Sequence, residues 1–95
     1  MFNLTRGHVT SLHSILSLNF WAENILFERG YPGTRVRVHE DVARIECLPG
    51  FLEKLIRNPE REQIVAKLKK IGFRYISLDM EGYRTGSLNP ENIQL

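Results

Sequence analysis

The sequence predicts an α+β domain, in which a mainly antiparallel sheet of three or four strands carries helices on one face. Apolar residues recur with the 3.6-residue period of a helix in some segments and with the two-residue period of a strand in three others. These segments follow one another as helix, strand, strand, helices, strand, an order that packs helices against a sheet. An additional strand at the start would make the order that of a ferredoxin-like fold.

The length and composition indicate one domain. The chain has 95 residues, of which 42% are hydrophobic and 25% charged, which is typical of a globular protein and too small for a two-domain nucleotide-dependent enzyme. We expect a core over residues 17–80, preceded by a segment without clear pattern at 1–16 and followed by a loop and tail at 81–95. Apolar runs are far shorter than the roughly 20 residues of a membrane span, so we expect a cytoplasmic protein.

The first half of the chain predicts one helix. Val9–Leu12 is expected to hold at most a short edge strand, and a helix begins at Ser14 or Ser17 and ends at Gly30, which suits the left-handed end of a helix. We expect the aromatic residues of this helix to lie in the core, although two of them widen the apolar surface enough to seat a partner chain. The apolar stripe consists of Leu18, Trp21, Ala22, Ile25 and Leu26, and the two further aromatic residues are Phe20 and Phe27.

A hairpin follows. Thr34–His39 and Val42–Leu48 both alternate between apolar and polar residues, and Glu40 and Asp41 separate them. With these two as the turn, the apolar residues of both strands share the face toward the core. Cys47 falls on this core face, so we expect a buried thiol rather than a nucleophile.

The second half predicts two helices and a strand. A short helix spans Phe51–Arg57. The next helix begins at Asn58-Pro59, with asparagine as N-cap and proline as the first helical residue, and ends at Gly72. Arg74–Met80 then alternates again, with Ile76, Leu78 and Met80 on one face.

The polar face of the hairpin suggests an anion site. In the expected register Arg37 lies opposite Arg44, and Arg35 lies opposite Glu46. Directly opposed like charges cost on the order of 0.2 to 1 kcal/mol, and a bound anion would neutralise them. In the alternative interpretation, Arg35 pairs with Glu46 and the other arginines lie on a solvated surface.

Further residues could join this face. The segment 82–87 places Arg84 between two glycines, which let backbone N–H groups approach a ligand, and arginine matches phosphate geometry. This combination suits a phosphate-bearing ligand, so we predict a phosphate site on this face of the sheet. The surrounding polar residues would support it: His39, Arg44, Tyr75, Ser77, Asp79 and Ser87.

The sequence gives little support for a disulfide, a metal site or a nucleic-acid-binding surface. A single cysteine excludes an internal disulfide, and His8, His13 and His39 have no metal-type spacing, so we predict no metal site. The net charge of +2 is weak evidence for nucleic acid, and Tyr75 lacks the second aromatic residue of a base-stacking platform, so nucleic acid is not expected as a partner.

Three segments resemble a known family. They are Ala22–Leu26, then RVRVHEDVARIE at Arg35–Glu46, then GFRYISLDMEGYRTGSLN at Gly72–Asn89. Together they resemble the C-terminal domain of the ATP-dependent sacrificial sulfur transferases of the PP-loop superfamily, which help to build the nickel-pincer nucleotide cofactor of lactate racemase. The resemblance implies that Arg35, Arg37, Glu46 and Arg84 face an active site shared with a PP-loop domain, which adenylates the substrate carboxylate.

The sequence also departs from this family. It contains no Ser-Gly-Gly-x-Asp-Ser phosphate loop, so ATP would enter only through a PP-loop domain or partner, and the chain alone is not expected to transfer sulfur. We expect a domain that binds a phosphorylated small molecule, or that assembles with itself or with a PP-loop ATPase subunit. A ferredoxin-like regulatory or RNA-binding module and a gene fragment without independent activity remain as alternatives.

Overall fold

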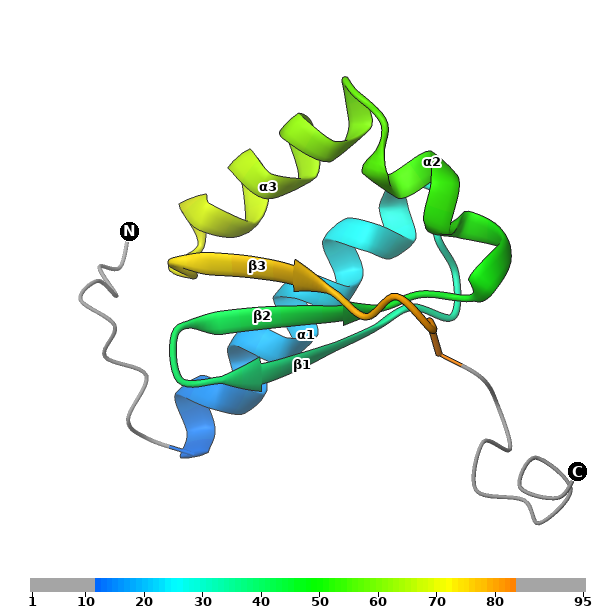
Figure 1. The fold of residues 1–95 in the computed structure, drawn as a ribbon. Coiled ribbons are helices and arrows are strands. Elements are labelled where there is room, and N and C mark those ends of the chain that lie inside the picture. Colours follow the sequence, from blue (N-terminus) through cyan, green and yellow to red (C-terminus); the bar gives the residue numbers. More distant parts are fainter. Residues whose placement is uncertain (1–11, 84–95) are drawn as a thin grey trace, which may run out of the picture.

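The computed structural model describes residues 12–83, with side chains from Ser17 onward. The element order expected from the sequence is confirmed in this part of the chain (Figure 1). In chain order the elements are α1 (Leu12–Glu28), β1 (Arg35–His39), β2 (Val42–Glu46), a 3₁₀ turn (Pro49–Phe51), α2 (Leu52–Ile56), α3 (Glu60–Lys70) and β3 (Tyr75–Leu78).

The sheet is mixed, so the prediction of a mainly antiparallel sheet is confirmed only in part. Its strand order is β1-β2-β3; β1 and β2 pair antiparallel, whereas β2 and β3 pair parallel. The reason is the connection between β2 and β3, because α2 and α3 carry the chain back along the sheet before β3 begins (Figure 1).

The expected first strand is not seen in the described residues. Leu12 already belongs to α1, and residues 9–11 lie outside the described range. Without that strand, the ferredoxin-like order is not confirmed.

The register predicted for the hairpin is confirmed. Arg37 lies opposite Arg44 and Arg35 opposite Glu46. The turn succeeds without glycine because Glu40 itself adopts a left-handed conformation, with φ of 57°.

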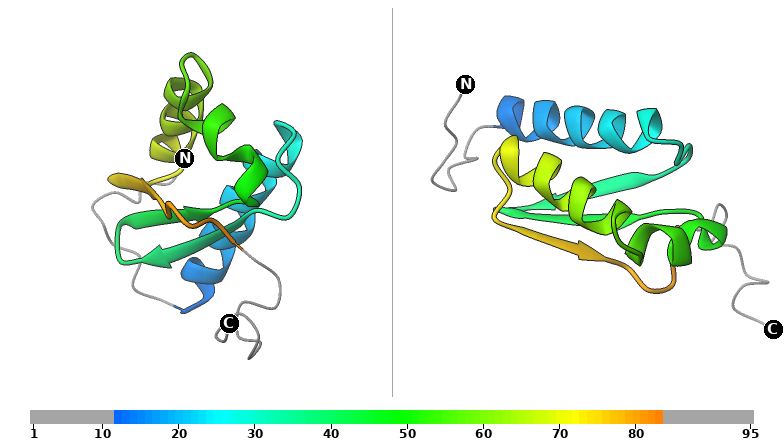
Figure 2. Two further views of the ribbon diagram at one scale, coloured as in Figure 1. Left: turned by 45° about the vertical axis from the view of Figure 1, so that its right-hand side comes forward. Right: turned by 90° about the horizontal axis from the view of Figure 1, so that it is seen from above.

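The core lies between the sheet and the helices, which pack on one face of the sheet as expected (Figure 2). Leu18, Ala22 and Leu26 of α1 recur at every fourth residue and are buried together with Ile64 and Leu68 of α3. The inward residues of β1 and β2 meet them, namely Val36, Ala43 and Ile45.

Cys47 lies in the same core, as predicted. Its side chain is fully buried, and this burial raises the pKa of the thiol. A high pKa leaves little thiolate near neutral pH, so the residue is a structural thiol.

Three aromatic side chains expected in the core are exposed instead. Phe20 and Phe27 are 64% exposed and Trp21 is 55% exposed, since a single sheet covers only one side of α1 and these residues lie outside the Leu18–Ala22–Leu26 stripe. Met80 is 86% exposed because β3 ends at Leu78 and the alternation ends with it.

The start of α3 also differs from the prediction. The helix begins at Glu60, Pro59 occupies the cap position, and no side chain caps it, so Asn58 is not the N-cap. The end agrees with the prediction, since Gly72 has a φ of 126° just after the helix. None of the helices within residues 12–83 has both the length and the apolar character needed to cross a membrane.

Candidate functional site

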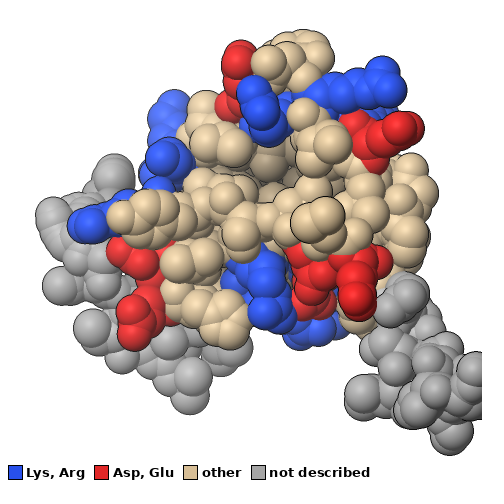
Figure 3. Space-filling model, in the orientation of Figure 1, with Lys and Arg blue, Asp and Glu red and all other residues tan. Residues whose placement is uncertain are grey.

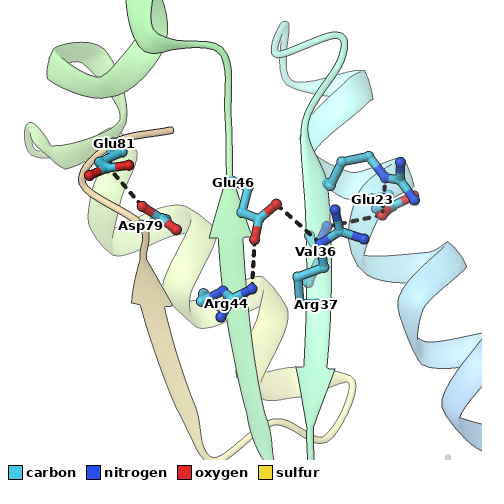
Figure 4. A network of polar contacts seen from close by, with 8 residues as sticks. Glu23, Val36, Arg37, Arg44, Glu46, Asp79 and Glu81 are labelled. Carbon is cyan, nitrogen blue, oxygen red and sulfur yellow. Dashed lines mark hydrogen bonds and ion pairs between the residues drawn. The ribbon is translucent and has the colours of Figure 1, made fainter. Parts of the chain in front are cut away.

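Two opposed arginines share one carboxylate on the sheet face that lies away from the helices (Figure 4). Arg37 of β1 donates from Nε to Glu46 Oε1 at 3.1 Å, and Arg44 of β2 donates from a terminal nitrogen to Glu46 Oε2 at 2.7 Å. The carboxylate thus supplies the negative charge for which the sequence interpretation invoked an anion. Glu46 is only 8% exposed, whereas both arginines are half-buried.

Arg35 is held by α1 and not by Glu46, its cross-strand neighbour. Its Nε donates to Glu23 Oε2 at 3.2 Å, and this ion pair raises the pKa of the guanidinium. The alternative in which Arg35 pairs with Glu46 was therefore wrong.

Glu23 is a residue that the sequence interpretation missed. Its Oε2 also accepts the backbone N–H of Val36 at 2.9 Å. With the Asn19 amide oriented so that both its atoms are satisfied, Asn19 donates to Glu23 Oε2 and to the Val36 carbonyl, each at 3.0 Å. Asn19 and Glu23 are four residues apart on α1 and lie outside its apolar stripe, so they share one polar side of the helix. This spacing was the only signal in the sequence that could have pointed to them. Together they cover the outer backbone of β1 at Val36 and fix Arg35 beside it.

The segment after β3 returns to the same region. The Tyr83 backbone N–H donates to the Cys47 carbonyl at 2.6 Å, and the Arg35 guanidinium carbon lies 6.0 Å from the centroid of the Tyr83 ring. Gly82, with a φ of 77°, permits this approach, since a Cβ there would lie 2.6 Å from the Cys47 carbonyl oxygen. Arg84 and Ser87, two of the predicted site residues, lie outside the described range.

The arginine cluster, which we define as Arg35, Arg37 and Arg44 with the carboxylates Glu23 and Glu46, has a formal charge of +1. Each guanidinium has five N–H donors and uses only a part of them on these carboxylates. The Arg44 Nε is buried and has no hydrogen-bond partner among the described residues. Figure 3 shows basic and acidic atoms side by side along the lower edge of the molecule, so this is a local cluster and not an extended basic surface.

The other predicted residues divide by their position in the sheet. Ser77 lies beside Arg44 in the register, and Asp79 follows at the end of β3, where its carboxylate accepts the Glu81 backbone N–H at 2.9 Å. His39 and Tyr75 both flank Val42 near the hairpin turn and are exposed. They lie four residue positions along the strands from Arg35 and Glu46, away from the centre of the cluster.

A metal centre finds no support in residues 12–83. No group of three or more histidine, cysteine, aspartate or glutamate side chains comes together there. The arrangement suits the binding of an anion by guanidinium groups that are held in place by carboxylates.

Comparison with known proteins agrees with the resemblance noted in the sequence. No family model matches the chain. The chain is 36% identical, over 81 residues, to the pyridinium-3,5-bisthiocarboxylic acid mononucleotide synthase of Lactiplantibacillus plantarum, which covers 84% of the chain and 28% of the synthase. It is also 37% identical, over 68 residues, to an uncharacterised protein of Synechocystis sp., which covers 72% of the chain and 25% of that protein.

The chain thus spans about a quarter of the length of these relatives. Its resemblance to part of a sulfur transferase of the PP-loop type is confirmed over most of its length.

Proposed function

We propose that this chain is a phosphate-binding domain of the sulfur-transferase type, which positions a phosphorylated small molecule for a PP-loop partner. The observation that carries the proposal is the arginine cluster, in which Glu46 holds Arg37 and Arg44 side by side. This cluster lies in a segment with the sequence RVRVHEDVARIE, within a chain that resembles part of a mononucleotide synthase. A mononucleotide carries a phosphate group, which is the ligand that paired guanidinium groups recognise best.

The electrostatics of the cluster favour a dianion. A phosphate monoester carries roughly −1.5 to −2 charges at neutral pH, against the formal +1 of the cluster. Glu46 keeps the two opposed guanidinium groups from repelling each other while the site is empty. The guanidinium N–H donors that the two carboxylates do not use are the ones that would bind the ligand.

The cluster would act by positioning and not by bond-making. Fixing the phosphate of a substrate at one end orients its other end, and orientation of this kind removes part of the entropic barrier of a reaction. ATP binding and activation would belong to the PP-loop partner, and we propose that this chain assembles with such a partner or with copies of itself.

The phosphate site can be tested by NMR. We expect inorganic phosphate to shift the side-chain Nε–H signals of Arg35, Arg37 and Arg44, and Arg37→Gln to abolish the shifts at Arg44. Arg57→Gln is the matched control, because it removes the same charge from an exposed residue outside the cluster. Shifts of equal size at all arginines, or none at the cluster, would refute the site.

The partner can be tested separately. A version of the Lactiplantibacillus synthase without the segment that matches this chain should bind it in size-exclusion chromatography. Elution of the two proteins as separate species would argue against assembly and leave the phosphate site unaffected.

A further inference from the structure

The two edge strands of the described sheet differ in whether their outward backbone groups have hydrogen-bond partners. On β1, the outer backbone N–H of Val36 is bonded to Glu23, and its carbonyl accepts from Asn19. On β3, the N–H groups of Tyr75 and Asp79 bond inward, to the carbonyls of Asp41 and Ile45.

Alternate residues of a strand direct their N–H and C=O groups to opposite edges, so Ile76 and Leu78 present theirs outward. No other strand of the described sheet lies beside them. An open edge of this kind is a template for pairing with another chain.

An apolar groove of about 160 Å³ adjoins this open edge. Ile76 and Leu78 of β3 form one wall, and Ile56, Ile64 and Val65 of α2 and α3 form the other. The space-filling view shows it as an uncharged hollow above β3 (Figure 3).

The groove lies on the helix-covered face, beside Ile76 and Leu78 of β3, and Ile45 of β2 also lines it. An inward side chain of a strand added to the outer edge of β3 would point toward this groove. A cavity of about 150 Å³ is large enough for a benzene ring, so the groove has room for one large apolar side chain.

The charge at the rim indicates the kind of strand. Arg61 lines the groove and is exposed, and it has no ion-pair partner within residues 12–83. A carboxylate beside it would complete a pair across the new interface.

We propose that the outer edge of β3 receives an extended segment of another polypeptide, which adds as a fourth strand, places an apolar side chain in the groove and sets a carboxylate against Arg61. Main-chain hydrogen bonds to Ile76 and Leu78 would give affinity, and the groove and Arg61 would give specificity. This surface is separate from the arginine cluster, so the inference does not depend on phosphate binding.

The test is hydrogen exchange of the full chain, followed by NMR. The probe is a blocked synthetic peptide of alternating valine and threonine with one glutamate. Bound peptide should slow exchange of the Ile76 and Leu78 amides by about tenfold when it is present at ten times its Kd. Inorganic phosphate should leave both amides unchanged.

A charge exchange provides the matched control. Arg61→Glu should weaken binding of the glutamate peptide about two- to five-fold, as expected for an exposed ion pair, and a lysine version of the peptide should recover it. Arg61 is exposed, so this variant should fold normally.

Three results would overturn the proposal. The first is exchange at Ile76 and Leu78 that the peptide does not slow. The second is slow exchange of both amides in the dilute chain without peptide, which would mean that the chain covers its own edge. The third is protection that rises with chain concentration alone, which would identify a second copy as the occupant.

Discussion

Neutralising Glu46 is the most direct test of how the arginine cluster is held. In Glu46→Gln the side chain keeps its shape but loses its charge, so Arg37 and Arg44 remain opposed without a negative charge between them. We expect the variant to fold with a lower free energy of unfolding than the wild-type chain.

The magnitude follows from the contacts. Two hydrogen bonds to a charged group, at 3.1 and 2.7 Å, contribute about 1.5 to 3 kcal/mol each when well shielded. The Arg37 and Arg44 side chains are 38% and 40% exposed, so water replaces much of what is lost, while the opposed charges add up to about 1 kcal/mol of repulsion. We therefore expect a loss of about 2 kcal/mol.

Urea unfolding followed by far-UV circular dichroism measures this loss. The only tryptophan, Trp21, is exposed and would be a poor fluorescence probe. Glu53→Gln is the matched control, because it removes the same charge from an exposed position on α2, and it should change the free energy of unfolding by less than about 0.5 kcal/mol.

Phosphate adds a second measurement. An anion that replaces the lost carboxylate should stabilise Glu46→Gln more than the wild-type chain, by RT ln(1 + [phosphate]/Kd) for each. If Glu46→Gln and Glu53→Gln were equally stable, the carboxylate would not hold the cluster and the reasoning would fail.

Three other predictions concern Gly82, Tyr31 and Glu60. Gly82→Ala should lower the free energy of unfolding by about 2 kcal/mol or more, because the added Cβ would clash with the Cys47 carbonyl oxygen. Gly30 also has a positive φ but open space around it, so Gly30→Ala should lower the free energy of unfolding by only about 1 kcal/mol. Urea unfolding of both variants measures the difference. Burial, and then the Glu60 charge, raise the pKa of Tyr31 from 10.0 to about 12. The unfolded state therefore loses the phenol proton first, and the free energy of unfolding should fall as the pH rises from 10 toward 12. Tyr31→Phe should remove this dependence of the free energy of unfolding on pH. The hydrogen bond from Arg29 lowers the pKa of Glu60 from 4.5. The ionised Glu60 carboxylate should therefore stabilise the fold above pH 4.5, and this stabilisation should be lost as the pH falls further. When the free energy of unfolding is measured by urea unfolding at a series of acidic pH values, Glu60→Gln should not show this loss.

Local pattern was enough to predict most of the described elements. The two-residue period of Arg35–Glu46 gave both the hairpin and its register, because a shift by one residue would have placed its arginines in the core. The period also predicted that Cys47 is buried. The direction of β3 could not be read in this way, because alternation is the same in parallel and antiparallel strands.

The ion-pair partners of the charged residues could not be predicted from local sequence patterns either. Register alone pointed from Arg35 to Glu46, but the structure pairs Arg35 with Glu23 of α1, twelve residues earlier. The exposure of Trp21 and Phe27 depends on which side of α1 the sheet covers, and periodicity within the helix does not specify how wide the covered side is.

The amino-acid sequence by itself determined which segments are helices and strands, which side of each strand faces the core, and the kinship with part of a sulfur transferase. Only the tertiary structure decided that one carboxylate serves two arginines and that α1 covers the edge of β1. It also decided that, within residues 12–83, no strand pairs with the outer edge of β3 beside the apolar groove. The physical reason is that periodicity reports the surroundings of a residue averaged along its own element. Ion pairs and open edges depend instead on how separate elements meet in space.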